Sequence, residues 1–168
     1  MTYFEIFGIP VQLKVATKAL SDRFFALSRE FHPDFHAQAG EKALEDAQEK
    51  SALLNKAWKT FQSTDETIKY VLQLRGLLEE EEKYQLPPDF LMEVMEINEA
   101  LMEPEDADTA TLSTRIDQLQ HEIYEPVKKV VEDYQDSTVS EKELLQVKEY
   151  YYKKKYLDRI RQQLAGMA

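Results

Sequence analysis

The tetrapeptide Phe31-His32-Pro33-Asp34 stands between two segments of helical periodicity and decides the fold of the N-terminal half. Upstream of it, apolar residues recur at the spacing of one helix face, namely Leu20, Phe24, Leu27 and Phe31. Pro33 ends this helix, because the residue before a proline is disfavoured in helical geometry. A second helix is expected from Glu41 to about Gln62, with one face formed by Leu44, Ala47, Ser51, Leu54, Trp58 and Phe61. The pattern predicts a helical hairpin with His32, Pro33 and Asp34 in its loop.

The chemistry of this loop permits two interpretations from the residues alone. In the first, His32 and Asp34 form a general base and its orienting carboxylate, or bind a metal together with His36. No third catalytic group or nucleophile accompanies them in the sequence. In the second, His32 and Asp34 cap helix ends around a proline stop, which is the commoner use of such a short motif.

Composition excludes several classes of function. The chain has 168 residues with a net charge of -11, and it contains 4 Gly and no Cys. The missing cysteines exclude disulfides, thiolate metal sites and a cysteine nucleophile. The acidity argues against nucleic acid as a partner, since a phosphate backbone requires a basic surface. No glycine-rich phosphate-binding motif occurs, and the 43% hydrophobic fraction is sufficient for a folded core.

The negative charge is concentrated in one half of the chain. Residues 1–76 carry 10 basic and 10 acidic side chains, whereas residues 77–168 carry 11 basic and 22 acidic ones. Such asymmetry indicates either two units with different partners or a helical half whose surface is simply well solvated.

The rest of the chain also has helical periodicity, and no convincing alternating strand appears. Thr17 is expected to cap the helix before the loop, and a shorter helix follows Ser63-Thr64-Asp65 and ends near Gly76. Residues 77–86 look like a linker. Pro87-Pro88-Asp89 then begins a helix that ends before Pro104.

Two further helices are expected after a polar connector at 105–110. The first has a long apolar pattern with a kink at Pro126: Leu112, Ile116, Leu119, Ile123, Val127, Val130 and Tyr134. After a break at 137–140, the last helix spans about 141–164 with Leu145, Tyr152, Tyr156 and Ile160 along one side. The predicted fold is all-α, with a small helical domain followed by a three-helix bundle.

No targeting or membrane segment is evident. The first ten residues have no Lys or Arg before their short apolar stretch, and no apolar run of about 18 residues occurs. We therefore expect a soluble cytoplasmic protein.

The helix that begins at Pro88 has an unusual outer face. At 100° per residue, its core arc consists of Phe90, Val94, Ile97 and Leu101. Leu91, Met95 and Met102 lie on its flank. Met92 projects nearly opposite the core arc, in an acidic row formed by Glu96, Glu99 and Glu103. Met92 is either a stray surface residue or part of an apolar and acidic strip that binds a protein.

The loop and its context resemble a J-domain, the family that docks on DnaK-class chaperones and stimulates their ATPase. The resemblance rests on His32-Pro33-Asp34, on the opening Tyr3–Ile9 and on Leu54–Trp58 in the second helix. It implies that His32, Pro33 and Asp34 contact the chaperone, with Arg23 and Arg29 as electrostatic support. J-domains usually have a basic preceding helix, but this one also carries acidic residues, and Phe35 stands where a basic residue is common.

The similarity extends across almost the whole chain to HscB-type co-chaperones, and a bacterial-type member is the better match. It rests on the run from Phe90 to Glu99 and on Tyr70-Val71-Leu72 before Gly76, with Thr67 where the family often has Arg. It implies a J-domain at 1–76, a linker at 77–86 and a scaffold-binding three-helix bundle at 87–168. The residues implied to bind the iron–sulfur scaffold protein IscU are Leu91, Met92, Met95, Glu96, Glu99, Glu103 and Tyr156.

The resemblance implies a non-enzymatic co-chaperone that delivers IscU to the DnaK-class chaperone HscA and stimulates its ATPase. We expect no metal, no other cofactor, no nucleic acid and no membrane among its ligands. One alternative is a J-domain co-chaperone that serves a different client protein. A more remote alternative is a small metal-dependent hydrolase that uses His32, Asp34 and His36.

Overall fold

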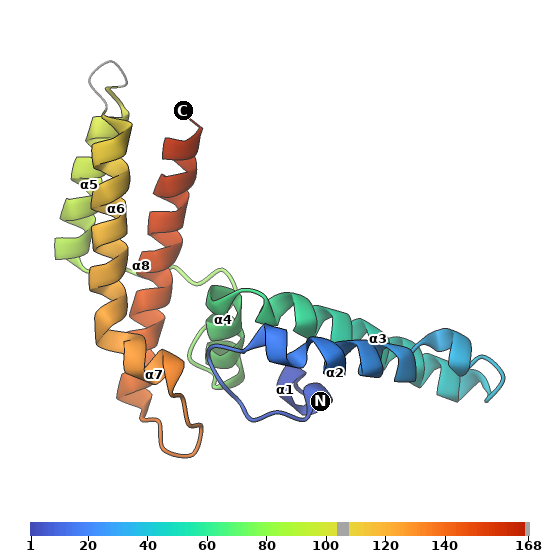
Figure 1. Cartoon of the computed structure of the whole chain (residues 1–168). Helices are drawn as coiled ribbons and strands as arrows, with labels where there is room; N and C mark the ends of the chain where they lie inside the picture. Colours follow the sequence, from blue (N-terminus) through green and yellow to red (C-terminus); the bar gives the residue numbers. More distant parts are fainter. Residues whose placement is uncertain (104–107, 167–168) are drawn as a thin grey trace. The chain divides into compact units, whose positions relative to one another are not determined.

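The computed structural model of the chain describes residues 1–103 and 108–166, and within them it contains helices and no strand (Figure 1). The predicted all-α class is therefore confirmed for this part of the chain. The elements in chain order are α1 (Tyr3–Phe7), α2 (Thr17–Glu30), η1 (Pro33–Phe35), α3 (Glu41–Phe61), α4 (Thr64–Leu74), α5 (Pro88–Leu101), α6 (Thr109–Tyr124), η2 (Glu125–Val127), α7 (Lys128–Glu132) and α8 (Glu141–Ala165).

The chain divides into two compact units. The N-terminal unit comprises Met1–Val71 with Tyr134–Ser137, and the C-terminal unit comprises Leu72–Asp133 with Thr138–Ala168. The first therefore contains the helices around the His32-Pro33-Asp34 loop, and the second contains the helix that carries Met92.

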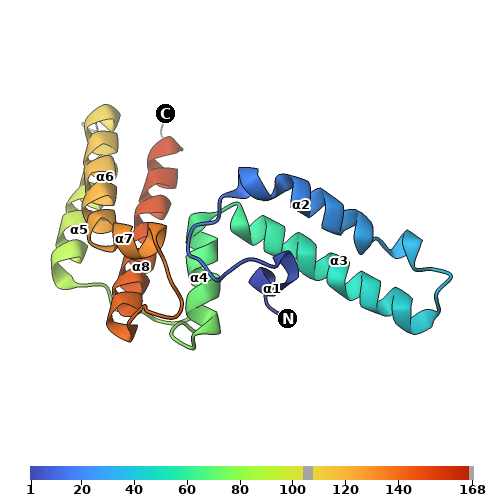
Figure 2. The same cartoon turned by 60° about the horizontal axis from the view of Figure 1, so that its bottom comes forward.

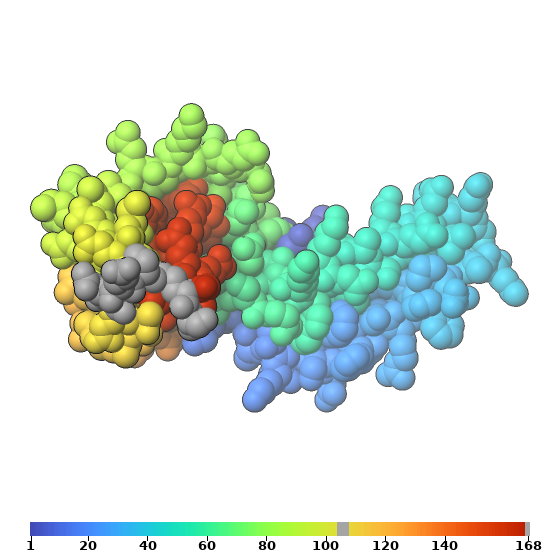
Figure 3. Space-filling view, turned by 90° about the horizontal axis from the view of Figure 1, so that it is seen from above, coloured from blue at the N-terminus to red at the C-terminus, as the bar shows by residue number. Residues whose placement is uncertain are grey.

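The N-terminal unit is built on the predicted hairpin of α2 and α3 (Figure 2). None of the side chains on α2 is fully buried, because its apolar stripe is covered only by α3 along most of its length. The Phe24 ring stacks on Trp58 of α3, with ring centroids 4.6 Å apart and planes 10° apart. Blue and cyan atoms of the two helices are in contact along the hairpin in Figure 3. This packing makes the loop between α2 and α3 the far end of a two-helix arm.

The base of the hairpin is closed by α1 and α4. The buried side chains at this base come from α1, α3 and α4. They include Phe4, Phe7, Leu54, Phe61 and Ile68. Thr67, the one buried polar residue among those described, donates its hydroxyl proton toward the carbonyls of Ser63 (2.8 Å) and Thr60 (3.1 Å). Its polar group is therefore satisfied inside the core.

The expected cap of α2 is wrong. Thr17 is the first helical residue, and the capping position belongs to Ala16, which makes no side-chain hydrogen bond. A hydroxyl satisfies the free N–H groups of a helix only from the residue that precedes the first turn. Thr2 and Ser140 occupy that position at α1 and α8, and each forms a reciprocal capping box with the glutamate three residues later.

The C-terminal unit is the predicted bundle of three helices, in which α5, α6 and α8 lie side by side (Figure 1). Its core consists of Phe90, Val94, Ile97, Ile116, Leu119, Leu157, Ile160 and Leu164. Leu101 packs against this core while partly buried, so the predicted core arc of α5 is confirmed. α6 begins earlier than expected, because the Asp108 side chain accepts hydrogen bonds from the N–H groups of Ala110 and Thr111. Residues 104–107 of the expected connector lie outside the described residues.

The proline kink occurs where the sequence predicts it. α6 ends at Tyr124, the 3-10 turn η2 contains Pro126, and α7 resumes at Lys128. After this turn Val131 is buried and Val130 is only half-buried, which corrects the expected apolar register by one residue. The 3-10 turn interrupts the α-helical winding, so the spacing of the α6 stripe does not carry over into α7.

The expected apolar side of α8 is only partly correct. Ile160 is buried, Tyr152 and Tyr156 are half-buried, and Leu145 is exposed. The buried positions instead move around the helix, and Leu144 and Leu164 differ by about 200° at 100° per residue. α8 buries different faces along its length, so no single stripe describes it.

The segment before α5 packs onto α8 of the same unit. Leu78 is buried, the Glu82 carboxylate lies 2.7 Å from the Lys148 ammonium, and the Tyr84 ring stacks on Tyr152 at 4.5 Å. The residues expected to form a linker therefore have specific side-chain contacts. None of the helices in residues 1–103 and 108–166 combines the length and apolar character that a membrane crossing requires.

Candidate functional site

The His32-Pro33-Asp34 loop has a defined local structure at the end of α2. His32 is extended (φ -64°, ψ 128°), as expected for a residue that precedes proline, and it caps the η1 turn. Its Nδ1 accepts a hydrogen bond from the Asp34 backbone N–H at 3.3 Å. The Asp34 carboxylate oxygen Oδ2 lies 3.7 Å from the same nitrogen. The capping interpretation of His32 therefore describes its local geometry.

This cap leaves the polar groups of the loop available to a partner. Because Nδ1 accepts the bond, the proton of a neutral His32 ring is on Nε2, which can donate to another molecule. The side chains of His32 and Asp34 are 51% and 88% exposed. Pro33 fixes the backbone between them.

The structure does not bring His32, Asp34 and His36 together as metal ligands. Nε2 of His36 donates a hydrogen bond to the Glu30 carbonyl at 2.8 Å, so that ring is tied to the end of α2. Within the described parts of the chain, no group of three or more His, Asp or Glu side chains could hold a metal ion. The hydrolase interpretation therefore has no ligand cluster to support it there.

The two predicted basic residues of α2 are both exposed but differ in their surroundings. Arg29 lies three residues before His32, whose backbone N–H donates to the Arg29 carbonyl at 3.3 Å. The Arg23 guanidinium lies against Gly8, since a Cβ added to that glycine would be 3.0 Å from Nη2. Only Arg29 is therefore placed beside the loop.

Two phenylalanines near the loop were missed as functional candidates. Phe25 is 62% exposed and Phe35 is 71% exposed. The Phe35 ring meets the His32 ring edge to face, with centroids 6.2 Å apart. The sequence could have indicated the exposure of Phe25, because this residue lies outside the apolar stripe of α2.

The outer face of α5 has the exposure that its sequence pattern predicts. Met92 is 66% exposed and Met95 is 55% exposed, and Glu96, Glu99 and Glu103 are also exposed. Leu91 is half-buried at the edge of this face. We call these six residues the α5 strip. Met102, which is 81% exposed, lies beside it but was not among the predicted site residues.

Tyr156 has a different environment from the α5 strip. Its hydroxyl accepts a hydrogen bond from Nδ2 of Asn98 at 3.2 Å, and its ring meets Phe90 edge to face at 6.4 Å. It is half-buried, so it contacts α5 from α8 and exposes only part of its side chain.

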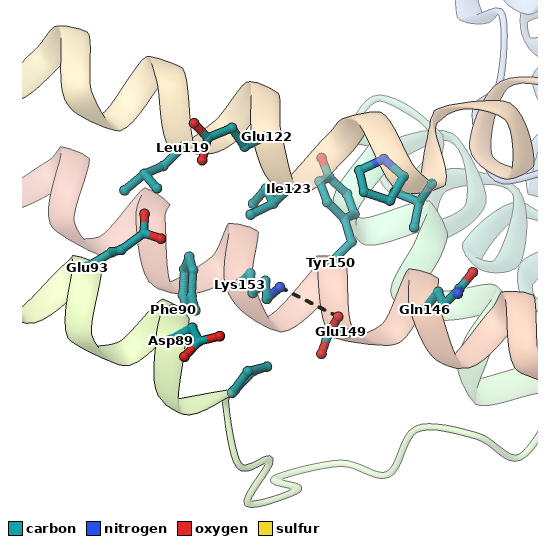
Figure 4. Close-up of a pocket in the computed structure, with 13 residues that line it drawn as sticks. Asp89, Phe90, Glu93, Leu119, Glu122, Ile123, Gln146, Glu149, Tyr150 and Lys153 are labelled. Atoms are coloured by element: carbon teal, nitrogen blue, oxygen red, sulfur yellow. Dashed lines mark ion pairs between the residues drawn. The ribbon is translucent and has the colours of Figure 1, made fainter.

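A pocket lies on the other side of α5, between α5, α6 and α8 (Figure 4). Its lining combines apolar side chains such as Phe90 and Ile123 with carboxylates that include Asp89 and Glu122. Lys153 faces it and lies 3.5 Å from the Glu149 carboxylate, the dashed contact in Figure 4. The sequence did not indicate this pocket, because its residues come from three separate helices.

Comparison with known proteins agrees with this arrangement. Residues 86–165 match the family model described as the HSCB C-terminal oligomerisation domain. A solved structure, chaperone HscB from Vibrio cholerae, matches 98% of this chain and 96% of that chain with a TM-score of 0.78 and 27% identity. The chain therefore has the fold of HscB structures over nearly its whole length, and residues 86–165 match the C-terminal domain of that family.

A second HscB structure and an HscB homolog show the same likeness. The crystal structure of human co-chaperone protein HscB covers 98% of this chain and 81% of that one, with a TM-score of 0.77 and 28% identity. The co-chaperone protein HscB homolog of Vibrio cholerae serotype O1 (strain M66-2) is 38% identical over 102 residues. That match spans 60% of this chain and 60% of the relative's length. The predicted architecture, a J-domain hairpin followed by a helical bundle, is confirmed by these structures.

Proposed function

We propose that this chain is a co-chaperone that delivers the iron–sulfur scaffold protein IscU to the DnaK-class chaperone HscA and stimulates its ATPase. In this proposal residues 1–76 act as the J-domain, 77–86 as a linker and 87–168 as the scaffold-binding bundle. The chain acts without a cofactor, and ATP hydrolysis is catalysed by the chaperone.

The observation that carries the proposal is the exposed, capped loop at the end of the hairpin. The Nδ1 bond to the Asp34 N–H and the ring of Pro33 hold the loop in one conformation before any partner binds. A preformed loop loses less conformational entropy on binding than a flexible one. In this role His32, Pro33 and Asp34 contact the chaperone, and Arg23 and Arg29 add electrostatic support.

The α5 strip supplies the second binding surface of the proposal. Exposed methionines make adaptable apolar contacts, and the glutamates around them favour a basic patch on the partner. Tyr156 completes this surface from α8. The exposed methionines do not belong to the bundle core, to which α5 contributes Phe90, Val94 and Ile97 from its opposite side.

A single chain with both surfaces raises the effective concentration of scaffold at the chaperone. Binding to one partner makes the encounter with the other intramolecular, and this can increase the apparent affinity without any new contact. The scaffold should therefore enhance the effect of this chain on the chaperone.

ATPase measurements on purified HscA-type chaperone would test the proposal. We expect the full-length chain to stimulate ATP hydrolysis, IscU to increase that stimulation further, and His32→Gln to abolish most of it. Stimulation that is insensitive to IscU would instead favour a co-chaperone for another client. The absence of stimulation, or full stimulation by His32→Gln, would contradict the loop assignment.

A further inference from the structure

In the described part of the chain, the exposed aromatic side chains are both near the His32-Pro33-Asp34 loop. Phe25 and Phe35 are exposed, whereas every other described phenylalanine, tyrosine and tryptophan is buried or half-buried. Both exposed rings lie within ten residues of Pro33 along the sequence. Exposed phenylalanines contribute little to folding, and two of them beside one loop indicate a binding surface.

The end of α2 connects the Phe25 side of the helix to the loop. Phe25 and Arg29 are at i and i+4, so they lie on one face of α2, about 6 Å apart along its axis. The bond from the His32 N–H to the Arg29 carbonyl (3.3 Å) ties the start of the loop to this end of the helix. The Phe35 ring extends this surface through its edge-to-face contact with His32. We call Phe25, Arg29, His32 and Phe35 the aromatic face.

Charge on this side of α2 is nearly balanced. Lys18 and Asp22 are one turn apart, and Arg29 follows two turns later, all of them with at least partial exposure. Opposite charges one turn apart on a helix partly cancel each other's field. Long-range electrostatic steering from this face is consequently weak. Close apolar contact is the stronger source of affinity that the surface offers.

From this arrangement we propose that the aromatic face docks on an apolar patch of the DnaK-class chaperone, and that Phe25 and Phe35 contribute most of the docking affinity. The inference rests on the proposed function. The chaperone is the chosen occupant because His32, the residue proposed to engage it, stands between the two phenylalanines in the sequence and contacts the Phe35 ring. A carboxylate beside the patch would pair with Arg29.

Dose-response measurements of chaperone ATPase stimulation by the full-length chain would test this proposal. Phe25→Ala and Phe35→Ala should each raise the half-maximal concentration about tenfold, the size typical of an interface anchor. Phe25→Leu should retain most of the stimulation, because it keeps an apolar side chain. Leu145→Ala, at an exposed apolar residue of the other unit, is the matched control and should change nothing.

Salt dependence provides the second measurement. The half-maximal concentration for the unmodified chain should change less than about threefold between about 50 and about 300 mM salt, because screening weakens ion pairs and not apolar contacts.

Three results would overturn the inference. Unchanged stimulation by both alanine variants, while His32→Gln abolishes it, would leave the proposed function standing and remove the role of the rings. A rise of more than about tenfold in the half-maximal concentration over the same salt range would show that charged groups supply most of the docking affinity. An unmodified chain that gives no stimulation would overturn the proposed function and this inference together.

Discussion

Nδ2 of Asn98 donates a hydrogen bond to the hydroxyl of Tyr156 at 3.2 Å, and this bond joins α5 to α8. The Tyr156 ring also meets Phe90 of α5 edge to face. Asn98 is half-buried, between the core arc and the α5 strip. The pair therefore supports the orientation of α5 that directs Met92 outward, and in the proposed function Tyr156 positions this helix in addition to contacting the scaffold.

Removal of the Tyr156 hydroxyl should destabilise the bundle. Tyr156→Phe keeps the ring contact with Phe90 but leaves the Asn98 amide without its partner, and we expect a loss of about 1 kcal/mol in the free energy of unfolding. Urea denaturation of the full-length chain measures this loss. In a double-mutant cycle with Asn98→Ala, the two effects should be less than additive. Full additivity would show that the bond contributes nothing.

The α5 strip can be tested through its affinity for the scaffold protein. We expect Met92→Ala to weaken binding of IscU about 5- to 30-fold in titration calorimetry, as for a central interface anchor. Glu96→Gln combined with Glu99→Gln should weaken it further and reduce its salt dependence, because two screened attractions are lost. Leu145→Ala and Glu122→Gln, outside the strip, are the controls. Unchanged affinity in Met92→Ala would remove this surface from the proposal.

The sequence was most informative where a helix buries one face throughout. The apolar stripes of α3 and α5 were predicted correctly, since each of these helices buries one constant side, and the stripe of α2 is half-buried against α3. The same reasoning failed for α8, because its buried side moves from Leu144 to Leu164 by more than half a turn. A pattern that assumes one stripe cannot describe a helix whose neighbours change along its length.

The binding surfaces were predictable only in part. The exposure of Met92 follows from the helical angle alone, because it needs nothing beyond the position of the core arc. The role proposed for Phe25 and Phe35 requires knowledge that neighbouring elements leave both rings uncovered, which depends on tertiary packing. The pocket in Figure 4 depends on packing for the same reason, since α5, α6 and α8 contribute to it together.

The ion pair between Glu82 and Lys148 should make stability depend on pH. A hydrogen bond from the Lys148 ammonium lowers the pKa of the Glu82 carboxyl below its ordinary value of 4.5. The pair therefore stabilises the fold fully above pH 4.5, and its contribution is lost as the pH falls through the lower pKa of the folded state. At neutral pH, Glu82→Gln should cost about 1 kcal/mol, since both side chains are mostly covered.

Urea denaturation of the unmodified chain and of Glu82→Gln at several pH values measures this effect. The difference in the free energy of unfolding between the unmodified chain and Glu82→Gln should shrink in acid. When both chains also carry Lys148→Met, most of this difference should disappear at every pH. Glu143→Gln is a useful comparison, because hydrogen bonds from Ser140 are the main cause that lowers the pKa of that carboxyl, and the charge of Lys129 contributes less. A difference for Glu82→Gln that stays constant from neutral to acid pH would contradict the assignment.

Two glycines with left-handed backbones allow a matched test of the contact between Arg23 and Gly8. Gly8 (φ +65°) and Gly76 (φ +71°) both require a conformation that costs alanine about 1–2 kcal/mol. A Cβ at Gly76 would meet nothing within 4 Å, whereas one at Gly8 would be 3.0 Å from Nη2 of Arg23. Because the guanidinium is the end of a flexible side chain, Gly8→Ala and Gly76→Ala should differ by less than about 0.5 kcal/mol in thermal and urea denaturation. A substantially larger loss in Gly8→Ala that disappears in Gly8→Ala with Arg23→Ala would show instead that Arg23 is held rigidly against α1.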